Sequence, residues 1–337
     1  MFDTRVTRRL GLTAPVANAG MAMVARPALA AAVSDAGGLG TIGCDIEGPD
    51  ALRAMVRETA RRTDRPFGVD LIGDFATDAH VDVLVDERVA VAIFFWRLPS
   101  PAQVARLHGV GAEVWMQVGS VAEADAAVET GVDALIVQGA EAGGHNRSEA
   151  SIFTLFPRLR RRYPALAMLW AGGVVDGATM AAALMLGADA VWCGTRFLAS
   201  REASAHSGYK AAVLAADVGD TAITRIYGPE WPDQPVRAIV NPGLERVRHG
   251  GQVAIDDVPM GHATVGGARV PLPRYSAILP TPDFEGDLDF ACLTAGQGAG
   301  NIDAIVGAAD IVAALMREAA ERFALCGTPR FEDACGR

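Results

Sequence analysis

The chain has 337 residues, half of them hydrophobic and only 21% charged, a composition that disfavours disorder, coiled coils and collagen-like arrays. It holds 40 acidic against 30 basic residues, which gives a formal charge of −10. Nucleic acids and anionic membranes attract proteins with a clustered positive field, so neither is expected as a partner.

The five cysteines form no CxxC pair, and no histidine stands at metal-ligand spacing from them. The sequence therefore predicts neither a disulfide framework nor a zinc site, and a reducing cytoplasm is the expected location. No segment reaches about 18 uninterrupted apolar residues, and no stretch at the N-terminus resembles a signal peptide. Secretion and membrane spanning are not expected.

From residue 15 to residue 193, short β-branched runs alternate with longer stretches of helical period, a rhythm typical of βα units around a parallel sheet. The predicted strands are residues 15–18, 39–43, 67–72, 89–95, 113–118, 134–138, 167–171 and 190–193. Helices that begin near Ser, Asp or Pro are predicted at residues 28–36, 51–62, 102–107, 121–130 and 177–186. Eight strands favour a (β/α)8 TIM barrel, with an open doubly wound sheet as the alternative.

The rhythm ends near residue 199, so we expect residues 1–199 to form the barrel core. Residues 200–290 are rich in Pro and Gly and are predicted to be an inserted cap or lid with little regular structure. Residues 291–325 contain a clean helical period over 303–323, which predicts a helix packed on the barrel. Residues 326–337 lack a period and are expected to be a loose tail.

Enzymes with this fold carry their chemistry at the C-terminal ends of the strands. The residues found there, in chain order, are Gly20, Met21, Asp70, Gln117, Gln138, Gly143, Gly144, Ala171, Gly172, Gly173, Gly194 and Thr195. The glycine turns after the last two strands leave backbone amides open, so we expect them to bind the phosphate of a ligand. No Rossmann GxGxxG motif and no Walker lysine is present to indicate NAD or ATP.

His145 is the catalytic candidate because it is the only histidine that directly follows a glycine-rich strand end. An imidazole also suits proton transfer near neutral pH. Glu141 either pairs with a nearby base or is solvated, and the basic residues of 158–162 are expected to form a solvated helix end. The other histidines are expected to be structural: His80, His108, His206, His249 and His262.

Several of these motifs resemble the FMN-dependent nitronate monooxygenases, once called 2-nitropropane dioxygenases. The matching runs are residues 35–40, 65–70, 138–145, 171–173, 194–197, 273–276, 279–282 and 295–300. The resemblance implies a barrel that holds one FMN non-covalently. The implied contacts are the amides of Gly172, Gly173, Gly194 and Thr195 for the phosphate, and Gly20, Met21, Gln117, Gly143 and Gly144 around the ring, with Asp70, Gln138 and Ala171 completing the site.

The resemblance also implies a reaction, in which a nitronate is oxidised with O2 to a carbonyl compound and nitrite. His145 would be a base toward a neutral nitroalkane or, when protonated, a partner for the nitronate. Two positions depart from the family: Asp70 stands where relatives often have Asn, and Gln117 where they often have Lys. Both changes make the pocket less favourable to anions, and an ionised Asp70 would act as an acceptor only.

The same motifs occur in the related FMN-dependent enoyl-thioester reductases, which residues 206–210 and 235–239 also resemble. An acyl-CoA or acyl-carrier-protein substrate, with NAD(P)H as a redox partner, is therefore the alternative, and His145 would then handle the proton at the α-carbon. Residues 228–290 would cover the acyl or CoA group, or would form the contact of a homodimer. A flavin-binding protein without turnover is a third alternative, which the intact His145 argues against.

Overall fold

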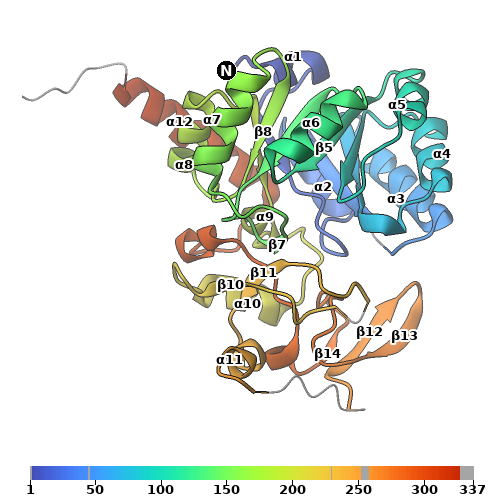
Figure 1. Cartoon of the computed structure of the whole chain (residues 1–337), viewed down its shortest axis with the longest axis vertical. Helices are drawn as coiled ribbons and strands as arrows, with labels where there is room; N and C mark the ends of the chain where they lie inside the picture. The colour runs from blue at the N-terminus through green and yellow to red at the C-terminus, as the bar shows by residue number, and fades with distance from the viewer. Residues whose placement is uncertain (1, 45, 229, 252–257, 327–337) are drawn as a thin grey trace, which may run out of the picture.

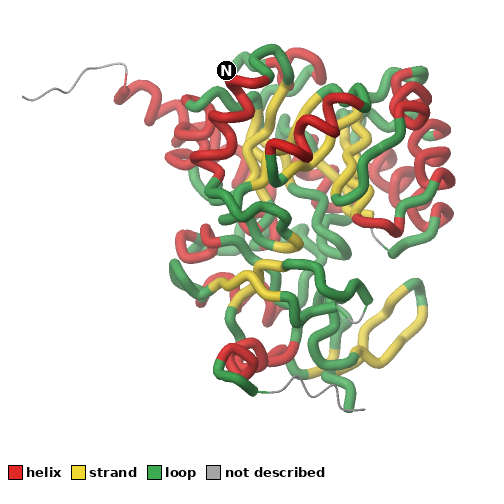
Figure 2. The backbone as a smooth tube through the Cα atoms, viewed as in Figure 1, coloured by secondary structure: helices red, strands yellow, loops and turns green. Residues whose placement is uncertain are grey.

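The structure, a computed structural model, describes residues 2–44, 46–228, 230–251 and 258–326. Eight parallel strands form a barrel, helices cover its outside, and the later part of the chain forms a cap at one end (Figure 1). Figure 2 shows the strands at the centre of the upper body with the helices around them. The predicted TIM barrel is confirmed. Within the described ranges, no helix is long and apolar enough to span a bilayer.

The barrel strands follow the predicted rhythm closely. They are β1 (Val16–Asn18), β2 (Gly40–Cys44), β3 (Phe67–Ile72), β4 (Val91–Phe95), β5 (Glu113–Val118), β6 (Ala134–Gln138), β8 (Ala167–Ala171) and β9 (Ala190–Cys193). β3, β5, β6, β8 and β9 have the predicted bounds, and the others differ by one or two residues at an end. The helices outside them are α2 (Pro27–Asp35), α3 (Pro49–Arg62), α4 (Asp78–Asp86), α5 (Pro101–His108), α6 (Val121–Glu129), α7 (Ile152–Arg162), α8 (Gly177–Met185) and α12 (Ala308–Cys326).

The barrel closes between β1 and β2, the two ends of the strand order β1-β9-β8-β6-β5-β4-β3-β2. A single parallel bridge joins Ala17 to Leu39 there. The fully buried Asn18 side chain completes the join, since its Oδ1 accepts from Thr41 N–H at 2.9 Å and its Nδ2 donates to the Thr41 carbonyl at 2.8 Å. One side-chain amide thus replaces a pair of ladder hydrogen bonds at the seam.

Two hydrophobic cores follow from the alternation of side chains along the strands. In β4, Val91 and Ile93 point into the barrel, whereas Ala92 and Phe94 pack under the helices. The interior is filled by Trp115 and Trp192 among small alanines, and α1 (Arg5–Leu10) closes the end opposite the cap by adding Val6 and Leu10. The barrel is therefore a packed core, and only its mouth is left to form a site.

The cap contains more regular structure than the sequence predicted. Its elements are α10 (Ser207–Ala215), β10 (Thr221–Thr224), β11 (Val236–Ile239), α11 (Pro242–Arg248), β12 (Gly261–Val265), β13 (Ala268–Leu272) and β14 (Glu285–Gly286). They form two small antiparallel sheets, and β11 also pairs with β7 (Gly144–His145), which lies in the loop after β6 (Figure 1). Such short strands between Pro and Gly residues give too little periodicity to be recognised.

The C-terminal helix α12 packs on α8 and begins later than the predicted residue 303. Val306 instead forms a bridge to Ser200, and its carbonyl accepts from Arg201 N–H at 3.0 Å. The Ala308 N–H is capped by Glu202 Oε2 at 2.9 Å. Partners distant in sequence therefore decide the helix start. Of the predicted loose tail, only Cys326 belongs to the described residues.

We expect Asn18→Ala to lower the free energy of unfolding by about 2–4 kcal/mol, because it leaves the Thr41 N–H and C=O buried without partners. Urea denaturation measures the loss. Asn301→Ala, which truncates an exposed asparagine, is the control and should change stability by less than about 0.5 kcal/mol. Equal stability of the two variants would contradict the role given to Asn18.

Candidate active site

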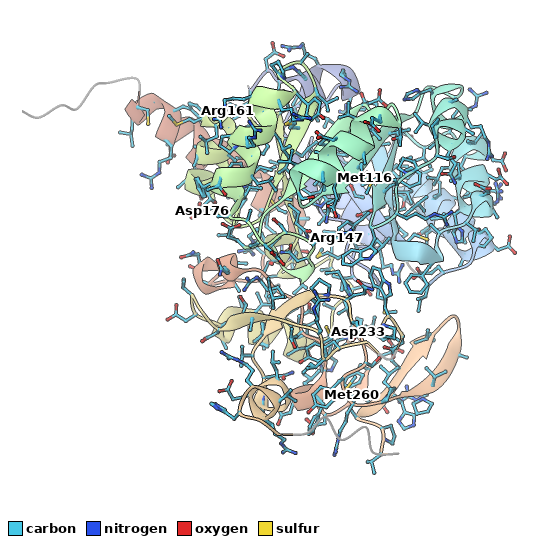
Figure 3. The ribbon with its side chains drawn as sticks, viewed as in Figure 1. Met116, Arg147, Arg161, Asp176, Asp233 and Met260 are labelled. Carbon is cyan, nitrogen blue, oxygen red and sulfur yellow. The ribbon has the colours of Figure 1, made fainter. Side chains whose placement is uncertain are left out.

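One cavity at the mouth of the barrel collects all the residues that the sequence proposed for the site. Its lining contains Gly20, Met21, Asp70, Gln117, Gln138, Gly143, Gly144, His145, Ala171, Gly172, Gly173, Gly194 and Thr195. The cap adds Glu230, Trp231, Ile278 and Leu279. Figure 3 labels Arg147 at the junction between barrel and cap, with Asp233 on the cap side. The cavity is therefore enclosed by strand ends on one side and the cap on the other.

The backbone of His145 is held by both parts of the chain. It pairs with Val236 of β11, and its carbonyl accepts from Gln138 Nε2 at 3.0 Å. The next residue, the buried Asn146, fastens the same loop, because its Nδ2 donates to the carbonyls of Gly139 and Ala142, each at 3.0 Å. A barrel loop and a cap strand together fix where the imidazole lies.

The imidazole of His145 lies in an apolar environment. Its ring centroid is 4.5 Å from that of Trp231 and 5.9 Å from that of Trp96, and Nε2 is buried with no hydrogen-bond partner in the described part of the chain. Burial disfavours the charged form and lowers the pKa of His145 to about 4. At neutral pH the ring is uncharged, and a deprotonated ring nitrogen can take up a proton.

Trp96 and Trp231 form a wall beside His145 that the sequence analysis did not find. Their ring centroids lie 4.7 Å apart, and Phe75 contacts Trp231 at 5.7 Å. Trp96 has a φ of 81°, a region that bulky residues rarely adopt and that is found at functional sites. The position of Trp96 directly after β4 was the available signal, whereas Trp231 belongs to no recognised motif.

Arg147 holds Trp96 in this conformation. Its guanidinium lies 4.9 Å from the Trp96 ring centroid, and Nη1 donates to the Trp96 carbonyl at 3.3 Å. Nε of Arg147 pairs with Glu123 Oε1 at 2.5 Å, which anchors it to α6. The cation–π contact and the hydrogen bond offset backbone strain that would otherwise cost about 1–3 kcal/mol.

The turns after β8 and β9 expose backbone to the cavity. Gly172 and Gly173 have φ angles of 128° and 72°, and a Cβ on Gly173 would meet no atom within 4 Å. Within the described ranges, the Gly173 N–H donates to no other group. At Gly194 the nearest atom to a Cβ is 3.7 Å away, and α9 (Thr195–Leu198) begins at the next residue. Open amides of this kind bind anions such as phosphate.

Other glycines of the site are required for close packing or for a positive φ angle rather than for an open amide. A Cβ on Gly143 would lie 2.3 Å from the Gly296 nitrogen, so this position packs against the chain at 295–296. Gly144 has a φ of 77° and faces open space. A Cβ on Gly20 would lie 2.2 Å from the Asp70 Cβ, so Gly20 makes room for that side chain.

Asp70 and Gln117 are buried at the ends of β3 and β5, with 2% and 6% of their surface exposed. Asp70 Oδ1 has no hydrogen-bond partner among the described residues, and burial raises the pKa of Asp70 to about 8. The carboxyl group is therefore mainly neutral at pH 7 and has a proton to donate. This differs from the ionised acceptor that the sequence analysis considered. The described lining contains no Lys or Arg.

Two further side chains weighed from the sequence have structural roles. Glu141 accepts from Ser151 Oγ at 2.6 Å and from Ile152 N–H, so it caps α7 rather than pairing with a base. His206 caps α10, with Nδ1 accepting from Gly208 N–H at 3.1 Å. Neither residue lines the cavity.

Comparison with known families gives a match over most of the chain. The sequence model of the family described as Nitronate monooxygenase matches residues 3–79 and 75–318. A nitronate monooxygenase of Pseudomonas aeruginosa is 34% identical over 266 residues, covering 65% of this chain and 76% of that protein. An octahydro-indene-carboxyl-CoA dehydrogenase of Rhodococcus jostii is 35% identical over 223 residues, covering 66% of this chain and 62% of that one.

Two solved structures superpose on nearly the whole chain. FabK from Thermotoga maritima superposes with a TM-score of 0.79 at 32% identity, covering 97% of this chain and 99% of that one. A nitroalkane oxidase from Streptomyces ansochromogenes gives a TM-score of 0.77 at 26% identity, covering 95% and 99%. The similarity to both includes the cap as well as the barrel.

We expect Trp231→Ala to raise the pKa of His145 from about 4 toward the ordinary value of about 6.5, because water would reach the ring. An NMR titration of the histidine ring protons in ligand-free protein measures the midpoint. Phe2→Ala is the control, since Phe2 contacts Phe323 and lies outside the cavity. An unchanged midpoint in Trp231→Ala would show that this wall does not set the pKa.

Proposed function

This chain belongs to the nitronate monooxygenase family of oxidoreductases, and we propose that its cavity binds one FMN non-covalently and oxidises alkyl nitronates with O2 to a carbonyl compound and nitrite. One observation carries the proposal. A histidine ring whose Nε2 is buried without a hydrogen-bond partner in the described part of the chain and two open glycine turns line the same cavity at the C-terminal ends of the strands.

The phosphate of FMN fits the turns after β8 and β9. The free N–H of Gly173 and the amides at Gly194 and Thr195 offer donors, and the two glycines have no Cβ to block an approaching anion. Thr195 Oγ1 accepts from Gly296 N–H at 2.9 Å, which ties the start of α9 to the chain that crosses the mouth. This arrangement supports a phosphate site that is already shaped before a ligand enters.

When bound, FMN supplies the transfer of electrons from substrate to oxygen. The chain contributes proton handling and a water-poor environment. Nε2 of His145 is uncharged at neutral pH and can remove a carbon-bound proton from a nitroalkane, which gives the nitronate. The rings of Trp96 and Trp231 limit the contact of the imidazole with water, so the ring is uncharged before the reaction and the proton that it accepts lies next to the negative charge of the nitronate.

A second candidate is oxidation or reduction of an acyl thioester. The observation that favours it is the similarity to FabK over 97% of the chain, supported by the CoA dehydrogenase relative. In that reaction His145 would move the proton at the α-carbon. The apolar Ile278 and Leu279 of the cap would contact the acyl chain.

Anaerobic stopped-flow absorbance of the purified protein loaded with FMN distinguishes the two. The protein is mixed separately with propyl-2-nitronate, with NAD(P)H and with acyl-CoA thioesters. Fast bleaching of the flavin by the nitronate supports the nitronate reaction. Bleaching only by NAD(P)H or a thioester would overturn it in favour of the thioester reaction.

We expect His145→Ala to retain FMN while its turnover falls about 10²–10⁴-fold, the usual contribution of a general acid or base. Flavin absorbance and steady-state rates with the nitroalkane measure the two properties. His249→Ala is the control, because the His249 side chain is 77% exposed on the cap. An unaffected rate in His145→Ala would remove this residue from the mechanism.

We expect Gly173→Val to abolish FMN binding, because the new side chain would occupy the space that the phosphate needs. Flavin content after saturation with FMN measures the effect. Gly111→Val is the matched control, since Gly111 also has a positive φ, 83°, and open space around it, but lies outside the cavity. Both variants carry backbone strain, so full flavin content in Gly173→Val would place the phosphate elsewhere.

A further inference from the structure

We propose that Asp70 keeps its proton in the folded protein and donates it as a hydrogen bond to the ring system of the bound flavin, so that above neutral pH reduction of the flavin takes up a proton at Asp70. This inference rests on the proposed flavin site. It makes Asp70 a residue that adjusts the cofactor in response to pH.

The position of Asp70 in the barrel favours the ring over the phosphate. Three strands separate β3, which carries Asp70, from β8 in either direction around the barrel, so the two strands face each other across the mouth. A flavin whose phosphate lies on the turns after β8 and β9 must extend away from them, toward the wall that contains Asp70. Both walls line the same cavity.

Nothing in the described structure uses the Asp70 carboxyl group. Oδ1 is buried without a partner, and only 2% of the residue is exposed. Its neighbours in the sheet register are Gly43 on β2 and Ile93 on β4, and Gly20 packs directly against its Cβ. None of these neighbours has a titratable side chain, so no described protein group satisfies the carboxyl group, and a ligand in the cavity can supply the acceptor.

The charged groups around this wall have partners of their own. Arg26 donates to the Gly43 carbonyl at 3.2 Å but is paired with Glu47. Glu230, on the cap side of the cavity, accepts from Ser276 Oγ and from Ala277 N–H. The remaining titratable residues of the lining, His145 and Cys193, are neutral at pH 7 because burial lowers the pKa of the first and raises that of the second. No described cation therefore compensates an ionised Asp70.

The carboxyl group brings a property that an amide at the same position lacks. A neutral carboxylic acid has one O–H donor, as an amide has N–H donors, but only the acid can lose its proton. Once ionised, Asp70 no longer donates and its negative charge opposes the arrival of electrons on the nearby ring. Reduction then favours return of the proton to Asp70.

The first test compares wild type with Asp70→Asn, an isosteric change that keeps a donor but cannot titrate. The reduction potential of the bound flavin is measured as a function of pH between 6 and 10, together with the protons taken up on reduction. Near pH 10, we expect reduction of the flavin in wild type to take up as much as one more proton per two electrons than reduction in Asp70→Asn. Asp50→Asn, which removes an exposed carboxylate, should behave as wild type. Equal proton uptake in wild type and Asp70→Asn would overturn the inference.

The second test uses flavin-free protein and does not depend on the cofactor. Because folding raises the pKa of Asp70 from 3.8 to about 8, the folded state binds the proton more tightly than the unfolded state. The stabilisation that the folded protein gains from the proton on Asp70 is complete below pH 4 and is lost as the pH rises to 8. The difference obtained by subtracting the Tm of wild type from the Tm of Asp70→Asn should therefore increase between pH 5 and 8 and stay constant above pH 8. A constant difference would mean that Asp70 is ionised and would also overturn the inference.

The two tests separate this inference from the proposed function. Failure of wild type to bind FMN would contradict the function, whereas the Tm comparison would still report the protonation of Asp70. Binding of FMN with identical proton uptake in both proteins would contradict the role of Asp70 and leave the flavin site intact.

Discussion

Burial of two titratable side chains at the barrel mouth sets the charge of the candidate site. The rings of Trp96 and Trp231 pack against His145, and the strand ends bury Asp70 on another wall of the same cavity. Because a charge is poorly stabilised in such surroundings, both groups prefer their neutral forms, with pKa values displaced in opposite directions. The cavity thus holds a base without its proton and an acid with its proton at the same pH.

Keeping that cavity closed depends on contacts between segments that are far apart in the chain. The cap strand β11 pairs with β7 and so fixes the backbone of His145. Glu230 holds its part of the cap through Ser276 and Ala277, and this brings the neighbouring Trp231 over the barrel. On the barrel side, Arg147 keeps Trp96 in its unusual conformation. The cap is therefore a structural part of the candidate active site.

The sequence predicted what local patterns determine. The βα rhythm placed the barrel strands, and the candidate residues chosen at the C-terminal ends of those strands line one cavity. It could not predict the contact between Trp96 and Trp231, because neither residue stands in a repeated pattern and the contact depends on how the cap folds back. The start of α12 and the protonation of Asp70 were missed for the same reason, since tertiary partners or their absence decide both.

The uncharged imidazole of His145 is compatible with the two kinds of substrate that the names of the relatives carry, nitronates and CoA thioesters. A nitroalkane and an acyl thioester both carry an acidic carbon–hydrogen bond next to an electron-withdrawing group, so the proposed base chemistry has the same requirement for either substrate class. The described lining offers neither Lys nor Arg to attract an anion. The charge of the described lining therefore does not discriminate between these two substrate classes, and the shape of the cap is the feature of the chain that can do so.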